Sequence, residues 1–320
     1  MKVIAKSLIA LVALTLVGAA VYFVTKPKSH RAEFEQFIKK YNKSYGSKSE
    51  HELKYKNFSS NFVKVQETNQ SNKSYKLAIN KYADLTFEEF KNIYLTTFET
   101  KSSKQVKSNI AFEANAQKDW VAERMVSPVK NQAACGSCWS FSTTGALESY
   151  LRIFKNDQSV LSEQELVDCS TGYGNMGCNG GLMASAYNYI NDNGLSSESD
   201  YSYTAMDGRC NAAAYRRQVN QGLYTSKQAF NNYKSYGEVQ QLLNQAPVAI
   251  AIEATNDFML YNSGVLEVDS SCGEGLNHGV LLVGYGFENN QNYVKIKNSW
   301  GTSWGEQGYI RVLFLSLIHI

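Results

Sequence analysis

The sequence has little proline, little cysteine and little histidine. Only three prolines occur in 320 residues, beside 22 glycines, which excludes collagen-like and proline-rich low-complexity chains. Six cysteines are too few for a small scaffold held together by disulfides. With 43% hydrophobic and 19% charged residues, the chain is long and apolar enough to fold into two packed lobes.

The net charge of +3 conceals an asymmetry between the two parts of the chain. Residues 1–113 carry 19 Lys and Arg against 10 Asp and Glu, whereas residues 114–320 carry 13 against 19. A basic part beside an acidic part is not the pattern of a uniformly basic nucleic-acid binder. We therefore expect no nucleic acid as a partner, and two segments that attract each other.

The first 25 residues have the pattern of a targeting segment. Lys2 and Lys6 precede an uncharged stretch, Ser7 to Val24, that is rich in Leu, Val and Ala. Small residues at 18–20 suit a signal peptidase, and the stretch also just reaches the length that spans a bilayer. A cleaved signal peptide and an uncleaved anchor, the only expected contact with a membrane, both remain open. Either one places the cysteines in an oxidising compartment.

Hydrophobic periodicity predicts a mixed α+β chain in which a helical lobe is followed by a sheet lobe. We expect two amphipathic helices within 31–69, a strand at 76–82, helices at 85–94 and 138–154, and strands at 248–252, 280–283 and 293–297. Ser162 and Glu165 have the spacing of a capping box that opens a further short helix. The polar stretch 96–117 indicates a domain boundary.

Four short Asn-x-Ser motifs precede this boundary, at Asn42, Asn57, Asn69 and Asn72. This pattern is the acceptor for N-linked glycosylation in the secretory pathway. Each match is weak evidence by itself.

The cysteine spacing raises three alternatives that the surrounding sequence disfavours. Cys135-Gly-Ser-Cys138 could be half of a zinc site, but Cys169 and Cys178 are not a second close pair and no histidine lies near. A thioredoxin-like redox pair lacks the preceding strand. Residues 172–177 match the dinucleotide fingerprint, yet a capped helix precedes them instead of a strand. We expect no metal and no cofactor.

A nucleophilic cysteine needs a base and a group that orients the base. Two of the four histidines lie in the basic first part and one is the penultimate residue, which leaves His278 as the credible base. If 287–292 forms a hairpin turn and the pairing is centred near residue 288, Asn298 lies directly opposite His278 and can orient the imidazole. Trp300, two residues further on, can shield the pair from water.

Cys138 lies at the expected start of its helix, where the helix dipole and a nearby imidazolium favour a thiolate. Gln132, six residues upstream, can donate its side-chain amide to an oxyanion together with the backbone N–H of Cys138.

These residues resemble the papain-like cysteine proteases, most closely the cathepsin L type. The resemblance rests on the stretch Asn131-Gln-Ala-Ala-Cys-Gly-Ser-Cys-Trp139, on Asn277-His-Gly279 and on Asn298-Ser-Trp-Gly301. Upstream, residues 50–69 fit the ERFNIN spacing of the family's prosegment, with Lys and Val replacing Arg and Ile. Residues 78–84 fit its GxNxFxD motif, with Ala for Gly and Tyr for Phe.

The resemblance implies a two-lobed papain-like fold, α+β, with a helical left lobe and a β-barrel-like right lobe after a helical prosegment. Residues 1–25 would be a signal peptide or anchor, 31–113 an inhibitory prosegment and 114–320 the peptidase domain, which begins near Ala114. Cys138 would be the nucleophile, His278 the general base and acid, Asn298 the orienting residue and Gln132 the oxyanion donor in peptide-bond hydrolysis through a thioester.

The resemblance also implies a substrate site and two disulfides. Gly180, Gly181, Leu182 and Met183 match the substrate-binding loop, with Trp300 beside the cleft. Met183, Ala251 and Leu276 match the P2 pocket, which would prefer Leu, Phe or Val. Cys135 would pair with Cys178, and Cys169 with Cys210.

The leading hypothesis is an acid-activated endopeptidase of a lysosome-like or phagosomal vacuole, or a secreted one. Its expected partners are polypeptide substrates, its own prosegment as an inhibitor, and cystatin-like inhibitors. The alternative is a non-enzymatic prosegment-type inhibitor or binder on the same fold.

Cys272 has no partner in this pairing scheme, and the apolar tail 312–320 holds no cysteine. We expect a sequence that is truncated or frameshifted after about Leu313, with intermolecular pairing of Cys272 as the alternative.

Overall fold

The computed structural model describes residues 29–98, 113, 116–212, 217–220, 236–267 and 275–314. The expected targeting segment, the expected start of the mature enzyme near Ala114, Cys272 and the chain beyond Phe314 lie outside these residues. Contacts divide the chain into two compact units, Met1–Phe62 and Val63–Ile320. Within the described ranges, no helix is long and apolar enough to cross a membrane.

Aromatic side chains join the two helices that begin the described chain. α2 spans Arg31–Tyr41 and α3 spans Lys48–Gln70, as the periodicity predicted. The ring of Phe34 on α2 lies 5.2 Å from that of Phe58 on α3, and both are buried. α2 ends at Asn42, whose left-handed φ of 49° suits asparagine at a helix C-terminus.

The chain after α3 adds a strand and a helix to the second unit. These are β1 (Tyr75–Leu77) and α4 (Phe87–Tyr94). β1 pairs antiparallel with β6 (Tyr261–Leu266), so the expected prosegment adds an edge strand to the sheet. The strand is shorter than the predicted 76–82, because Asn80 Oδ1 accepts the Tyr82 N–H at 3.0 Å and turns the chain.

Helices dominate the residues from 138 to 193. They are α5 (Cys138–Lys155), α6 (Glu163–Cys169), the 3₁₀ turns η1 (Ser170–Tyr173) and η2 (Gly177–Asn179), and α7 (Met183–Asn193), with the short pair β3 (Leu195–Ser196) and β4 (Arg217–Val219). The predicted capping box forms only in its first half. Ser162 Oγ accepts the Glu165 N–H at 2.9 Å, but the Ser162 N–H donates to Ser196 and the Glu165 carboxylate accepts from Tyr189.

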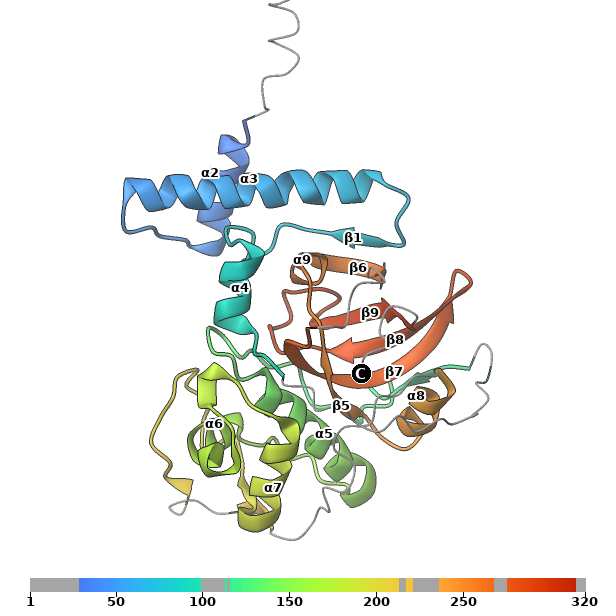
Figure 1. The fold of residues 1–320 in the computed structure, drawn as a ribbon. Helices are drawn as coiled ribbons and strands as arrows, with labels where there is room; N and C mark the ends of the chain where they lie inside the picture. The colour runs from blue at the N-terminus through green and yellow to red at the C-terminus, as the bar shows by residue number, and fades with distance from the viewer. Residues whose placement is uncertain are drawn as a thin grey trace, which may run out of the picture. The chain divides into compact units, whose positions relative to one another are not determined.

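The second half is a mixed sheet with short helices. Its elements are β2 (Lys118–Asp119), α8 (Tyr236–Leu243), β5 (Val248–Ile252), α9 (Asn256–Met259), β6, β7 (His278–Glu288), β8 (Gln291–Lys297) and β9 (Tyr309–Leu313). Among the described residues, the sheet has seven strands in the order β1-β6-β9-β8-β7-β2, with β5 also paired to β7. β7 is buried along most of its length and packs against α5, which joins the sheet to the helices (Figure 1).

The predicted register of the β7–β8 hairpin is wrong. The turn is the two-residue pair Asn289 and Asn290, both at positive φ, so the pairing is centred between them rather than near residue 288. Leu281 pairs with Lys297, where β8 ends. His278 and Asn298 are therefore not paired across the two strands.

Two disulfides pin the helical lobe, and they join the pairs that the family resemblance implies. Cys135 is bonded to Cys178 and Cys169 to Cys210. Among the described cysteines, this leaves Cys138 as the free thiol. At the other end of the described chain, Val312 and Phe314 are buried, so the start of the apolar tail is packed into the fold.

Candidate active site

The start of α5 lies against the start of β7. Cys138 is the first residue of α5, and its Sγ accepts a hydrogen bond from the Gly279 N–H at 3.3 Å. The close approach favours glycine there, because a Cβ at 279 would lie 3.1 Å from the Trp139 backbone, a tight contact. The helix N-terminus and the residue after His278 are therefore in direct contact, across the junction of the two lobes.

Asn298 holds the His278 ring although the two residues are not directly paired. The distance between His278 Nε2 and Asn298 Oδ1 is 2.8 Å. The Ser299 N–H also donates to Asn298 Oδ1 at 2.8 Å, which identifies this atom as the oxygen. The imidazole Nε2 therefore carries the proton, and Nδ1 keeps a free lone pair. Trp300 stacks on the imidazole with ring centroids 4.7 Å apart, and both side chains are fully buried.

Gln132 is held at both ends of its side chain. Ser299 Oγ donates to Gln132 Oε1 at 2.6 Å. Gln132 Nε2 donates to the carbonyl oxygens of Cys135, at 2.9 Å, and of Tyr94, at 2.8 Å. Because Tyr94 ends α4 of the prosegment, a prosegment carbonyl occupies one donor of the Gln132 amide.

The prosegment continues across the cleft in an extended conformation. The Thr96 N–H donates to the Asn277 carbonyl at 2.8 Å, and the Phe98 N–H donates to the Leu276 carbonyl at 3.0 Å. Gly180 makes room on the opposite side, since a Cβ there would lie 1.8 Å from Thr96 Oγ1. Gly181, the next residue of the same loop, lies against Trp139.

Phe98 and the expected P2-pocket residues share one apolar cluster. Phe98 is 8% exposed and belongs to the apolar core of the helical lobe. Met183, Ala251 and Leu276, and with them Leu182, are partly buried and pack against the same cluster. This phenylalanine thus occupies the cluster against which the side chains that sequence reasoning assigned to the P2 pocket pack.

Burial sets the protonation of the site in this precursor. Burial raises the pKa of the Cys138 thiol to about 12, although the Gly279 N–H opposes the shift. Burial lowers the pKa of His278 to about 4, against the effect of its hydrogen bond to Asn298. The two groups are therefore a neutral thiol and a neutral imidazole at pH 5 to 8 while the prosegment is in place.

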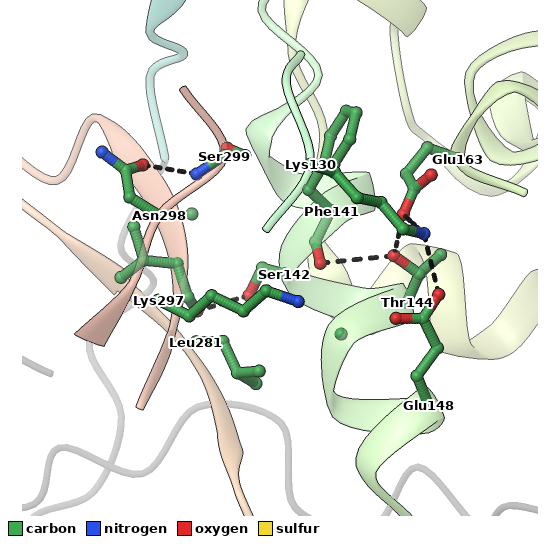
Figure 2. A pocket seen from close by; sticks show the side chains of 13 residues that line it. Lys130, Phe141, Ser142, Thr144, Glu148, Glu163, Leu281, Lys297, Asn298 and Ser299 are labelled. Atoms are coloured by element: carbon green, nitrogen blue, oxygen red, sulfur yellow. Dashed lines mark hydrogen bonds and ion pairs between the residues drawn. The ribbon is translucent and has the colours of Figure 1, made fainter. Parts of the chain in front are cut away.

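Sequence reasoning missed a buried ionic network behind the site. Lys130 Nζ lies 2.7 Å from Glu148 and 2.6 Å from Glu163. Figure 2 shows the lysine between the two carboxylates. Lys297 donates to Ser127 Oγ at 2.9 Å, and Ser127 Oγ in turn donates to Glu148. The available signal was Glu148, a charge on the apolar face of the helix that begins at Cys138.

This network connects the two lobes. Lys297 precedes Asn298 on the sheet side, whereas Glu148 belongs to α5, the helix that begins with Cys138. The charged side chains and Gly279 line a small cavity of ≈ 20 Å³. Burial raises the pKa of Glu163 to about 7, although Lys130 opposes the shift, and burial lowers the pKa of Lys297 to about 8.

Comparisons with known proteins agree with the two parts of this fold. Residues 114–315 match the papain family cysteine protease profile, and residues 34–90 match the cathepsin propeptide inhibitor domain. Cathepsin L 2 of Paramecium tetraurelia is 42% identical over 278 residues, which cover 85% of this chain and 84% of that protein. The thiol protease aleurain of Arabidopsis thaliana is 41% identical over 291 residues, which cover 88% of this chain and 80% of the relative.

Solved precursor structures show the same architecture. Digestive procathepsin L 3 from the larval midgut of Tenebrio molitor matches with a TM-score of 0.73 and 34% identity, covering 92% of this chain and 97% of that one. A recombinant stem bromelain precursor matches with a TM-score of 0.77 and 30% identity, covering 91% and 96%. The two-lobed papain-like fold with a prosegment is thereby confirmed. The chain belongs to the papain family of cysteine proteases and is made as a proenzyme with a cathepsin-type inhibitory propeptide.

Proposed function

We propose that Cys138 and His278 form the nucleophile and base of an endopeptidase, with Asn298 as the orienting residue. The observation that carries this proposal is the contact of Cys138 Sγ with the Gly279 N–H, next to an imidazole whose Nε2–H is fixed by Asn298. His278 Nδ1 takes the thiol proton, the thiolate attacks the peptide carbonyl, and the imidazolium returns the proton to the leaving amine. Water then hydrolyses the thioester by the reverse sequence.

Gln132 is the proposed oxyanion donor. Its Nε2–H group now donates to the Tyr94 carbonyl at 2.8 Å. Once the prosegment leaves, this N–H is available to the oxygen of a substrate carbonyl, where negative charge develops during attack. The Tyr94 carbonyl thus acts as a stand-in for substrate and blocks the site in the precursor.

The proposed substrates are polypeptides with Leu, Phe or Val at P2. Support comes from Phe98, whose apolar ring lies in the cluster that Met183, Ala251 and Leu276 pack against. A substrate side chain of similar size would bury a comparable apolar area there after maturation. In this proposal, Gly180, Gly181 and Leu182 line the opposite side of the cleft. Trp300 covers one face of the His278 ring and excludes water from that face.

Maturation near Ala114 in an acidic compartment completes the proposal. The family relationship supports a vacuolar, lysosome-like or secreted enzyme, reached through the N-terminal segment as a signal peptide or an uncleaved anchor. Cystatin-like inhibitors are expected to bind the opened cleft. The four site residues together favour this enzyme over a non-enzymatic inhibitor on the same fold.

The test is Cys138→Ser. We expect the matured variant, processed by added pepsin, to lose at least about a thousandfold in kcat/KM against a peptide amide with Leu or Phe at P2. Thr171→Ala, an exposed residue of the same lobe, is the matched control and should keep full activity. Peptide hydrolysis by the Cys138→Ser protein at the wild-type rate would refute the proposed mechanism.

A further inference from the structure

A tyrosine hydroxyl connects the two backbone segments that form the proposed oxyanion site. Tyr203 lies in the helical lobe, and its Oη is 2.7 Å from the Gln132 carbonyl oxygen and 2.6 Å from Ser137 Oγ. Gln132 is the proposed oxyanion donor, and Ser137 immediately precedes the proposed nucleophile Cys138. One side chain therefore contacts both of these backbone segments.

The direction of these hydrogen bonds follows from the number of protons. A carbonyl oxygen can only accept, so the single Tyr203 O–H donates to Gln132. The Ser137 hydroxyl must then donate to Tyr203 Oη. Burial raises the pKa of the Tyr203 phenol, so the phenol keeps its proton and this chain persists across the acidic and neutral range.

The Gln132 carbonyl belongs to a peptide group that needs to be held in place. The next residue, Ala133, has a left-handed φ of 51°, which is unfavourable for a residue with a Cβ. On its other side, the same peptide group is held because the Ala133 N–H donates to Asn131 Oδ1 at 3.1 Å. Tyr203 and Asn131 thus fix the two ends of the Gln132–Ala133 peptide plane.

The Tyr203 ring itself is anchored independently of its hydroxyl. Its edge packs on Phe141 with ring centroids 4.9 Å apart, and its backbone N–H donates to Glu198 Oε1 at 2.9 Å. Removing the hydroxyl alone therefore deletes both contacts to the site and leaves the ring packing.

We propose that Tyr203 is a positioning residue for the oxyanion site, acting through Gln132 and Ser137. Its hydroxyl fixes the Gln132 backbone relative to the start of α5, so that the Gln132 amide stays aimed at the carbonyl that Cys138 attacks. This inference rests on the proposed function of Cys138 and Gln132. It concerns charge stabilisation after attack, so it leaves the reactivity of the thiol itself unaffected.

The experiment measures oxyanion stabilisation and thiol reactivity separately. Matured Tyr203→Phe is compared with wild type in two reactions: hydrolysis of a peptide amide with Leu at P2, and thiol exchange with dipyridyl disulfide. The exchange reaction reports the nucleophile and its base but forms no oxyanion. We expect kcat to fall about fivefold to tenfold, as for the loss of one or two neutral hydrogen bonds. KM and the pH profile of thiol exchange should stay within about twofold of wild type.

Two further variants complete the test. Tyr201→Phe is the matched control, because the Tyr201 hydroxyl donates to Asp168 at 2.7 Å, away from Gln132; we expect its kcat to be unchanged. Ser137→Ala should lower kcat in the same sense, and the double variant with Tyr203→Phe should cost less than the sum of both changes. If Tyr203→Phe does not fold, the kcat of Ser137→Ala alone tests the proposed positioning role.

An unchanged kcat in Tyr203→Phe, or in Ser137→Ala where that variant decides, would overturn the proposal. A parallel fall of kcat and thiol exchange would also overturn it, because it would assign Tyr203 to the nucleophile rather than to the oxyanion. Neither of these two results would contradict the proposed function, which is refuted only if the Cys138→Ser protein keeps its activity.

Discussion

The four glycosylation motifs differ in what the folded chain does with their asparagine side chains. Asn57 is 9% exposed in the middle of α3. Asn69 uses both of its amide atoms, since Nδ2 donates to the Leu77 carbonyl at 2.8 Å and Oδ1 accepts the Leu77 N–H at 2.9 Å. Asn42 and Asn72 are exposed at turns that follow helices. A glycan on Asn57 or Asn69 would displace native contacts, whereas Asn42 and Asn72 are free to carry one.

We therefore predict glycans at Asn42 and Asn72 of the precursor made in a eukaryotic secretory host. Both sites lie in the prosegment, so the mature enzyme should carry none of them. Peptide mass spectrometry after enzymatic deglycosylation identifies each site by conversion of Asn to Asp. Modification of Asn57 or Asn69 in correctly folded precursor would contradict this assignment.

The pairing of His278 with Asn298 illustrates how far single residues could be predicted. Scarcity of histidine and the family motifs were enough to select both residues. The expected geometry was wrong, because the hairpin is centred between Asn289 and Asn290 rather than near residue 288. Trp300 stacks on the His278 ring, and Asn298 Oδ1 contacts His278 Nε2 although the two residues are not paired in the strands. Side-chain reach, rather than strand register, makes the contact.

At the scale of elements, α5 connects the proposed nucleophile to the buried ionic network. Glu148 of α5 is completely buried, and its neighbour Lys130 is shared with Glu163 of α6. Burial raises the pKa of Glu163, and repulsion from the Glu148 carboxylate, which shares the same lysine, adds to the shift. An acid with a raised pKa contributes stability fully below its ordinary value of 4.5, and the contribution is lost as the pH rises through 7.

Lys130→Met should lower the free energy of unfolding by about 3 kcal/mol, because it leaves two buried carboxylates without their cation. The loss should be larger at pH 8 than at pH 5, since Glu163 accepts a proton at the lower pH. Urea denaturation of the Cys138→Ser precursor measures both values. Lys155→Met, at the exposed end of α5, is the control and should change stability by less than about 0.5 kcal/mol. Equal losses in the two lysine variants would contradict a role for the network.

Elements with a local signal were predicted well, and those that depend on distant contacts were not. The apolar face of α5 and the two helices of residues 31–69 followed from periodicity. The order of the sheet did not, because β1 pairs with β6 nearly two hundred residues away; there Ser74 Oγ donates to the Val265 carbonyl. The burial of Lys130 depends on contacts from both lobes, so it cannot be predicted from any short stretch of the sequence.

At the scale of the whole molecule, the charge asymmetry corresponds to contacts between prosegment and peptidase domain. Lys64 lies 2.7 Å from Asp257 on α9, and the Tyr75 hydroxyl donates to the same carboxylate. Burial raises the pKa of Asp257, but the hydrogen bonds from Lys64 and Tyr75 outweigh it and the net pKa is lowered from 3.8. This contact therefore stays ionised at pH 4.5 and does not by itself release the prosegment at the pH of an acidic vacuole.

Unlike Asp257, His278 contributes a pH dependence that destabilises the closed precursor on acidification, in the pH range of an acidic vacuole. Its pKa is about 4 under the prosegment, against an ordinary 6.5. A base with a depressed pKa stabilises the closed precursor above pH 6.5, and this contribution is lost as the pH falls through 4. We expect release of the prosegment to expose one side of the His278 ring to water, so that release takes up a proton and is favoured by up to about tenfold per pH unit in this window.

We predict that removing this imidazole flattens the pH dependence of maturation. Trace mature enzyme cleaves the Cys138→Ser precursor in trans, and the rate is normalised to its rate on a small peptide at each pH. Between pH 6.5 and 4.5, the normalised rate should rise steeply for Cys138→Ser and much less for the double variant with His278→Ala. His51→Ala, in the prosegment, serves as the control with an unchanged slope. Equal slopes with and without His278 would exclude it as the proton acceptor.

The reactivity of the Cys138 thiol before and after prosegment removal tests the central claim most directly. Dipyridyl disulfide at pH 5 should react very slowly with the precursor, whose buried thiol has a pKa of about 12, and at least about a hundredfold faster with the matured enzyme, where His278 can hold the proton. The gain should vanish in matured His278→Ala. Equal rates for the precursor and the matured enzyme would contradict a Cys138–His278 site that the prosegment keeps closed.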